Sequence, residues 1–91
     1  MDYFQALSRH RTVIVTFNVV KLDELLKIHK GKTRESVMSV SSRIGLAPMT
    51  LLQTVSRARR GHIDTMNKAT AVAIADGIGC EWEEFAEEIV A

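Results

Sequence analysis

Four polar side chains between residues 50 and 57 recur at the spacing of one helix face: Thr50, Gln53, Thr54 and Arg57. A glutamine on such a face can bond an adenine edge at two atoms, which discriminates between bases by about 1–3 kcal/mol. The threonines can contact bases or phosphates, and Arg57 can pair with guanine or clamp a phosphate. Met49 lies at the start of this segment, where side chains reach base edges. The pattern predicts a surface that reads double-stranded DNA, although a merely solvated helix face has the same spacing.

Basic residues on either side of this face would hold the phosphate backbone rather than select a sequence. These residues are Lys32, Arg34, Arg59 and Arg60. The charges of the chain are also divided between its two parts. Residues 1–70 carry all 12 basic residues against five acids, whereas residues 71–91 carry six acids and no base. Such a division indicates that one part meets a polyanion and the other faces away from it, although segregated surface charge alone would give the same counts.

The other reactive side chains do not form a catalytic or metal-binding pattern. The three histidines are scattered without metal-ligand spacing, and Cys80, the only cysteine, has no basic neighbour in sequence that would lower its pKa. The adjacent glutamates at 83–84 and 87–88 are interpreted as a solvated face. We therefore predict no catalytic residue, no metal and no cofactor, and hence not an enzyme.

Three helices are expected to position the polar face. The first follows a cap at Asn18 and ends at Gly31, and the second follows a cap at Thr33 and ends at Gly45. The third begins at Pro48 and runs to about Arg60. Between the second and third helices, a steep crossing needs a small residue, and Ser41 supplies it. Four residues later the turn needs a glycine for an unusual backbone conformation, and Gly45 supplies that.

The segments on either side of these helices predict two more helices and one extended stretch. A fourth helix, capped by Asp64 or Thr65, is apolar on nearly all sides and should be the buried centre. A fifth helix at 82–89 should place its apolar side inward and its glutamates outward. The β-branched run Thr12–Phe17 reads as a strand that either pairs with its copy in another subunit or packs on the helices as an arm.

Two blocks of sequence carry a resemblance to a known family. VSSRIGLAPMTL (residues 40–51) looks like the helix-turn-helix of the lambda-repressor and Cro family, and AVAIADGIGCEWEEF (residues 71–85) looks like the segment from its fourth to its fifth helix. The region from about Val20 to Phe85 thus resembles that family of regulators, and covers about two thirds of the chain. The resemblance implies five helices, of which the third would enter the major groove.

The chain departs from the family pattern at three points. Ser41 stands where alanine is usual, and Thr54 stands where a branched apolar residue is usual, so that Val55 would take over the inward position. The interval from Thr50 to Gly61 is about one helical turn longer than is typical, which would extend the recognition helix. Leu52 would face outward, to contact either a thymine methyl group or another protein.

The expected fold is all-α: a compact five-helix domain at 19–91 after an N-terminal arm or strand at 1–18. The expected function is a sequence-specific transcriptional regulator, a phage or mobile-element repressor of the Cro type that acts by promoter occlusion. It would act in the cytoplasm as a homodimer, with no membrane contact. The alternative is a protein-binding module on the same fold, such as an antitoxin or anti-repressor.

Overall fold

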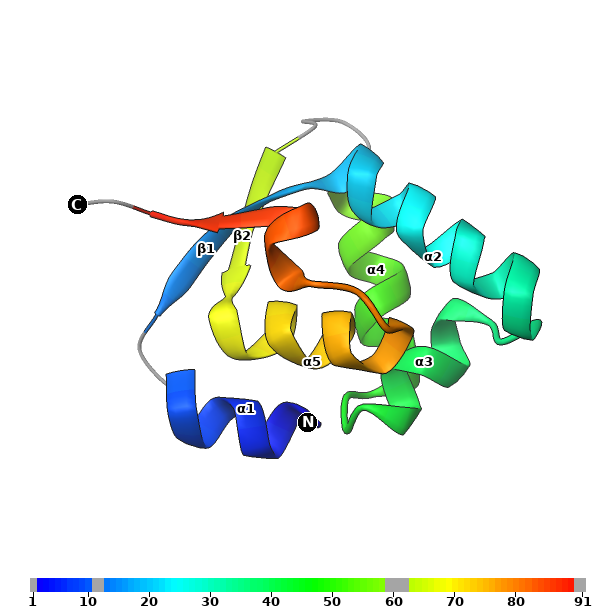
Figure 1. Cartoon of the computed structure of the whole chain (residues 1–91), viewed down its shortest axis with the longest axis horizontal. Helices are drawn as coiled ribbons and strands as arrows, with labels where there is room; N and C mark the ends of the chain where they lie inside the picture. Colours follow the sequence, from blue (N-terminus) through cyan, green and yellow to red (C-terminus); the bar gives the residue numbers. More distant parts are fainter. Residues whose placement is uncertain (1, 11–12, 59–62, 90–91) are drawn as a thin grey trace.

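The computed structural model describes residues 2–10, 13–58 and 63–89. The elements in these ranges are, in order, α1 (Tyr3–His10), β1 (Ile14–Asn18), α2 (Val19–Thr33), α3 (Val37–Arg43), α4 (Pro48–Ala58), β2 (Ile63–Asn67), α5 (Lys68–Ile78), a 3₁₀ turn η1 (Trp82–Glu84) and β3 (Ala86–Glu88). The expectation of an all-α fold is therefore wrong, because a three-stranded antiparallel sheet accompanies the helices. Figure 1 shows α5 between that sheet and α1, with α2, α3 and α4 on the other side of the molecule.

The predicted strand is confirmed over Ile14–Asn18, with Thr12 outside the described residues, but its partners lie in the same chain. β1 is the central strand of the order β2-β1-β3 and pairs antiparallel with both neighbours. Val15, for example, lies opposite Met66 of β2 and Glu88 of β3. Val15 and Phe17 point into the core, whereas Ile14 and Thr16 lie on the outer face. Both edges of β1 are thus satisfied without a second subunit.

Residues 63–67, which were expected to lead into the fourth helix, form β2 instead. The backbone N–H of Lys68 donates to the Val13 carbonyl at 2.8 Å, so the pairing with β1 continues to the first residue of α5. The Asp64 carboxylate accepts a hydrogen bond from the Thr65 N–H at 2.8 Å rather than capping the helix. This pairing joins residues that are 45 to 53 positions apart in the sequence, so local β propensity gives no sign of it.

The fifth predicted helix, at 82–89, is also wrong. Only Trp82–Glu84 forms a helical turn, and Ala86–Glu88 is strand β3. A continuous helix would place Glu83 next to Glu87 and Glu84 next to Glu88, which are repulsive i,i+4 pairs. As a strand, this segment forms backbone hydrogen bonds with β1. The first is donated by the Asn18 N–H to the Phe85 carbonyl at 2.7 Å.

The first ten residues include a helix that was expected to be part of an extended arm. A reciprocal cap starts α1: the Gln5 N–H donates to the Asp2 carboxylate at 2.9 Å, and the Gln5 side-chain carbonyl accepts from the Asp2 N–H at 3.1 Å. Its Ala6 is fully buried, and the helix lies along α5 (Figure 1). Within the part expected to be an arm, Tyr3–His10 is therefore a helix and Ile14–Asn18 is the central strand of the sheet.

The core centres on α5, as its small apolar residues predict. Its buried residues are Ala69, Ala71, Ala73, Ile74 and Ala75. Small side chains let α1 and α3 approach α5 closely. The largest buried side chains around it are Phe17, Leu22 and Leu51, from three different elements. No helix among the described residues is both long enough and apolar enough to cross a membrane.

Candidate nucleic-acid interface

Two short helices joined by a four-residue turn form the unit that the sequence singled out. Ser41 is fully buried where α3 meets α4, and its hydroxyl donates to the Ala47 carbonyl at 2.6 Å. The same oxygen accepts from the Leu51 N–H at 3.4 Å, which ties the start of α4 to α3. Gly45 has φ +93°, a conformation that strains any residue with a Cβ. The roles predicted for Ser41 and Gly45 are confirmed.

The inner faces of both helices pack into the core. Val40, Ile44 and Leu51 are at most 2% exposed, and Val55 is 4% exposed. Val55 therefore takes the inward position one turn after Leu51, as predicted. Leu52, expected to point outward, is half-buried. This burial fixes which side of α4 remains open to a partner.

The exposed side of α4 is centred on Met49, Gln53 and Ser56. These three residues lie opposite Leu51 and Val55 at helical spacing, and Met49 is 45% exposed. Thr50 and Thr54 are half-buried at the margin of this side, and the Thr54 hydroxyl donates to the Thr50 carbonyl at 2.8 Å. We call Met49, Gln53 and Ser56 the α4 face. The sequence reasoning missed Ser56, although its distance of seven residues from Met49 is a helical repeat.

The remaining predicted contacts divide into two groups. Arg59 and Arg60 lie outside the described residues, and so does the side chain of Arg57, whose backbone belongs to α4. Lys32 is exposed in the last turn of α2, and Arg34 is exposed as the C-cap of that helix, with φ 62°. Helix α2 thus extends past the expected stop at Gly31. Lys32 and Arg34 lie next to α3, whose N-terminus is capped by Ser36 rather than by the predicted Thr33.

The turn between α3 and α4 rests on α1 and α5. The Tyr3 N–H at the start of α1 donates to the Ile44 carbonyl at 2.7 Å. A Cβ on Gly45 would lie 3.4 Å from the Phe4 ring, and a Cβ on Gly77 would lie 2.6 Å from the Ile44 Cγ2. Helix α3 therefore approaches α5 so closely that only glycine fits at position 77 without displacing Ile44.

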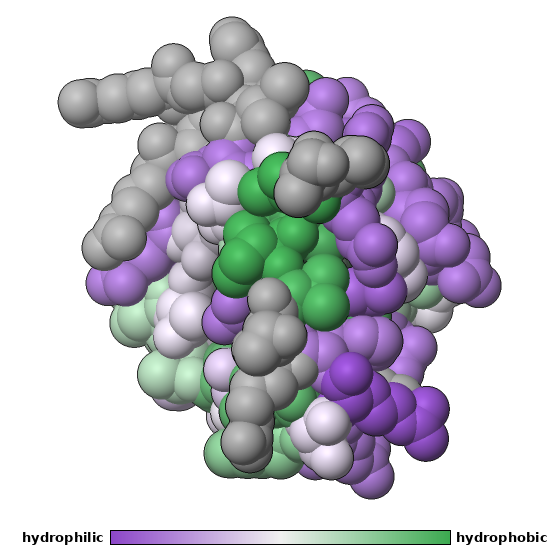
Figure 2. All heavy atoms as spheres, turned by 90° about the vertical axis from the view of Figure 1, so that its left-hand side faces the viewer, coloured by the Kyte–Doolittle hydropathy of each residue, from purple (hydrophilic) through white to green (hydrophobic). Residues whose placement is uncertain are grey.

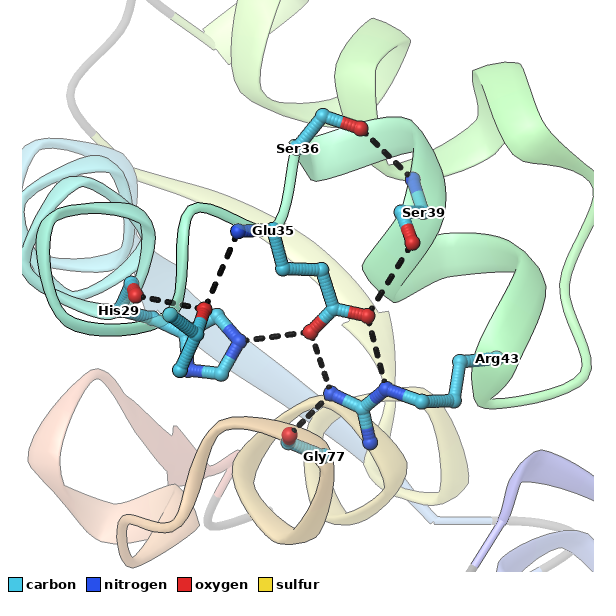
Figure 3. Close-up of polar contacts among 7 residues, drawn as sticks. His29, Glu35, Ser36, Ser39, Arg43 and Gly77 are labelled. Atoms are coloured by element: carbon cyan, nitrogen blue, oxygen red, sulfur yellow. Dashed lines mark hydrogen bonds and ion pairs between the residues drawn. The ribbon is translucent and has the colours of Figure 1, made fainter.

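Glu35 joins three helices through its carboxylate (Figure 3). Arg43 of α3 donates to both carboxylate oxygens at 2.8 Å and to the Gly77 carbonyl of α5 at 2.5 Å. His29 of α2 lies 2.7 Å from one oxygen, and the Ser39 hydroxyl donates to the other at 3.2 Å. The hydrogen bond from Arg43, followed by that from His29, lowers the pKa of Glu35 to about 2.

Cys80 has the environment of an unreactive thiol. Burial, together with the negative charges of the nearby Glu84 and Glu81, raises the pKa of Cys80 to about 11. A thiol that stays protonated at neutral pH is a poor nucleophile. This agrees with the sequence-based interpretation of Cys80 as a small apolar residue.

A second open surface is the outer face of the sheet. Figure 2 shows an apolar cluster near the middle of the side of the molecule formed by the sheet. Ile14 is 42% exposed and Ile89 is 51% exposed, and the Ile89 N–H donates to the Ile14 carbonyl at 3.4 Å. Glu87 is exposed beside them on β3, opposite Thr16, whereas Glu88 lies opposite the inward Val15 and is paired with Lys68. This surface is apolar and acidic, whereas the α4 face carries no charge at Met49, Gln53 and Ser56.

No protein-family model, curated protein or solved structure matches this chain.

Proposed function

We propose that the protein is a sequence-specific DNA-binding regulator that reads the major groove with the α4 face. The observation that carries the proposal is the arrangement of α3 and α4 around Ser41 and Gly45, which leaves Met49, Gln53 and Ser56 exposed on one side of α4. The major groove admits a helix that presents such a side. Of these residues, Gln53 is the one suited to bidentate recognition of adenine.

The distribution of charge favours DNA binding at the α4 face over DNA binding at the outer face of the sheet. Lys32 and Arg34 are exposed beside α3, and within the described ranges neither of them is paired with a carboxylate. The acids of residues 71–91 lie instead on the elements from α5 to β3. DNA would therefore approach α3 and α4, with Lys32 and Arg34 on phosphates, and Arg57, Arg59 and Arg60 would extend the contact.

In its finer form the proposal is a cytoplasmic, Cro-type repressor of phage or mobile-element origin that occludes a promoter. It would act as a homodimer, because two copies can place their recognition helices one DNA turn apart, about 34–36 Å, on a two-fold operator. The resemblance in residues 40–51 supports this form of the proposal.

The test begins with selection of binding sites from a random duplex library using the full chain. The affinity for the selected duplex and for a scrambled duplex is then measured by fluorescence anisotropy at several salt concentrations. We expect the selected duplex to bind at least about 10³-fold more tightly. The Gln53→Ala variant should lose about 1–3 kcal/mol on the selected duplex only, while Ser42→Ala on the exposed side of α3 changes neither affinity. A library that yields no preferred sequence contradicts the proposal.

The alternative function, a protein-binding module, is favoured by a different observation. Ile14 and Ile89 are exposed apolar side chains on paired segments of the sheet, and Figure 2 shows an apolar cluster on that side of the molecule. Such a cluster rimmed by polar residues is typical of protein contacts. If Ile14→Lys abolishes regulation in cells while Gln53→Ala leaves it intact, the protein-binding function replaces the DNA-binding one.

A further inference from the structure

The ionised Glu35 carboxylate holds helices α2, α3 and α5 together through its contacts with His29 and Arg43. The Glu35 carboxylate contacts His29 of α2 and Arg43 of α3, and Arg43 continues to the end of α5 at Gly77 (Figure 3). The contact between Arg43 and Glu35 uses both oxygens, a geometry that fixes direction as well as distance. These contacts span the two ends of α3, because Glu35 precedes its first turn and Arg43 is its last residue.

The seam between α3 and α5 is also the tightest contact of the turn. A Cβ placed on Gly77 would lie 2.6 Å from the Ile44 Cγ2, so the contact leaves no room for a side chain at position 77. Arg43, next to Ile44, donates to the carbonyl of that same glycine. The polar anchor and the close packing therefore act on adjacent residues of α3. Because Ser41 bonds α3 to the start of α4, a shift of α3 would carry α4 with it.

We propose that Glu35 and Arg43 are positioning residues for DNA recognition: without touching DNA, they set the orientation of α3, and thereby of the α4 face, against α2 and α5. This inference rests on the proposed function. The Glu35 side chain is only 17% exposed and points inward, although Lys32 and Arg34 nearby are exposed. An outward carboxylate there would repel phosphates, whereas the inward one is neutralised by Arg43.

Base contacts tolerate little displacement, whereas phosphate contacts of flexible lysines and arginines adapt. A misaligned α4 would therefore lose affinity for the selected duplex and keep its affinity for a scrambled one. A residue that only stabilised the fold would change neither affinity at a temperature where every variant is fully folded. The ratio of the two affinities is the readout that separates positioning from stability.

The experiment compares Glu35→Gln, Arg43→Gln and the double variant with the wild-type chain on both duplexes. We expect each single variant to lose about tenfold on the selected duplex, the size of one misplaced base contact. Affinity for the scrambled duplex should stay within about twofold. The double variant should lose no more than either single variant, because both act through one contact. The matched control is Asp23→Asn, which removes the carboxylate of an ion pair confined to α2 and should change neither affinity.

Equal losses on both duplexes for Arg43→Gln, with a salt slope reduced by about one, would overturn the inference, because Arg43 would then be a phosphate contact. Unchanged affinity for the selected duplex would also overturn it. Hydrogen exchange on the free protein tests the positioning role without DNA. In the Glu35→Gln variant, we expect the backbone amides of α4 to exchange faster than in the wild-type chain and those of β1 to be unchanged. If the wild-type chain selects no duplex, the proposed function fails, and unchanged exchange in α4 overturns the positioning role by itself.

Discussion

The helical unit formed by α3 and α4 and the three-stranded sheet depend on contacts between residues at very different separations along the chain. The helical unit is specified within about twenty residues, by a buried small side chain at Ser41 and a left-handed glycine at Gly45. The sheet joins distant positions such as Thr16 and Glu87, which are 71 residues apart. The helical unit can therefore be recognised in a short window of sequence. The sheet cannot, because its pairing depends on which strand edges elsewhere in the chain remain unpaired.

The difference also separates two kinds of surface. The helical unit buries Val40, Leu51 and Val55 and presents the uncharged α4 face. The sheet buries Val15 and Phe17 but leaves Ile14 and Ile89 exposed on the other side. We infer that recognition and structural support are divided between these regions, with DNA at the first and the body of the fold at the second.

The largest expected effect tests the role of the sheet in the fold. Phe17→Ala removes a side chain that is 1% exposed on the central strand and leaves a cavity next to α5. We expect the free energy of unfolding in urea to fall by about 3–5 kcal/mol. Thr16→Ala, on the outer face of the same strand, should cost less than about 1 kcal/mol. Similar losses for both variants would contradict the assignment of inner and outer faces.

The next effect tests the helical unit in the same way. Ser41→Leu places a larger side chain in a fully packed site and removes the hydroxyl that bonds Ala47 and Leu51. We expect a loss of about 2–3 kcal/mol in unfolding free energy. Ser42→Leu is the matched control, because the same substitution one residue later lies on an exposed side and should cost within about 0.5 kcal/mol. Equal costs at the two positions would mean that α3 does not pack on α4 through Ser41.

The sequence predicted the helical unit of α3 and α4 better than it predicted the sheet. The turn at Gly45, the small residue at Ser41 and the inward Val55 were predicted, because each requirement is met by residues of the unit itself. Strand β3 was predicted as helix and β2 as the segment leading into one, because the periodicity of the sequence says nothing about the unpaired edges of β1. Helix α1 was also missed, although the reciprocal cap of Asp2 and Gln5 is visible in the sequence.

The residues of the candidate site were also predicted only in part. Gln53 and Met49 were placed correctly on an exposed side of α4, whereas Thr50 and Thr54 lie at its margin. Their helical spacing was read correctly, but the exact direction of the exposed side depends on how α4 packs. The contact between Glu35 and Arg43 could not be predicted, because residues eight positions apart meet only through the bend between α2 and α3.

The smallest expected effect is a dependence of stability on pH through the Glu35 contacts that support the helical unit from α2 and α5. The pKa of Glu35 is about 2 in the folded protein, below its ordinary value of 4.5. A lowered carboxylate pKa stabilises the fold fully above pH about 4.5, and this contribution is lost as the pH falls toward 2. We expect Glu35 to account for about 1–2 kcal/mol of that loss, after allowing for solvent screening. Urea unfolding between pH 7 and pH 2.5 should show a flatter profile for Glu35→Gln than for the wild-type chain, and identical profiles would contradict the ion pair.

Mapping backbone amide chemical shifts while a DNA duplex is added at low salt tests the central claim most directly. The account predicts that the largest changes fall in α4, around Met49, Gln53 and Ser56, with smaller changes near Lys32 and Arg34. Residues of the outer sheet face, such as Ile14 and Glu87, should not change. Changes confined to the sheet, or none in α4 when the duplex is saturating, would contradict the claim that α4 is the surface that reads DNA.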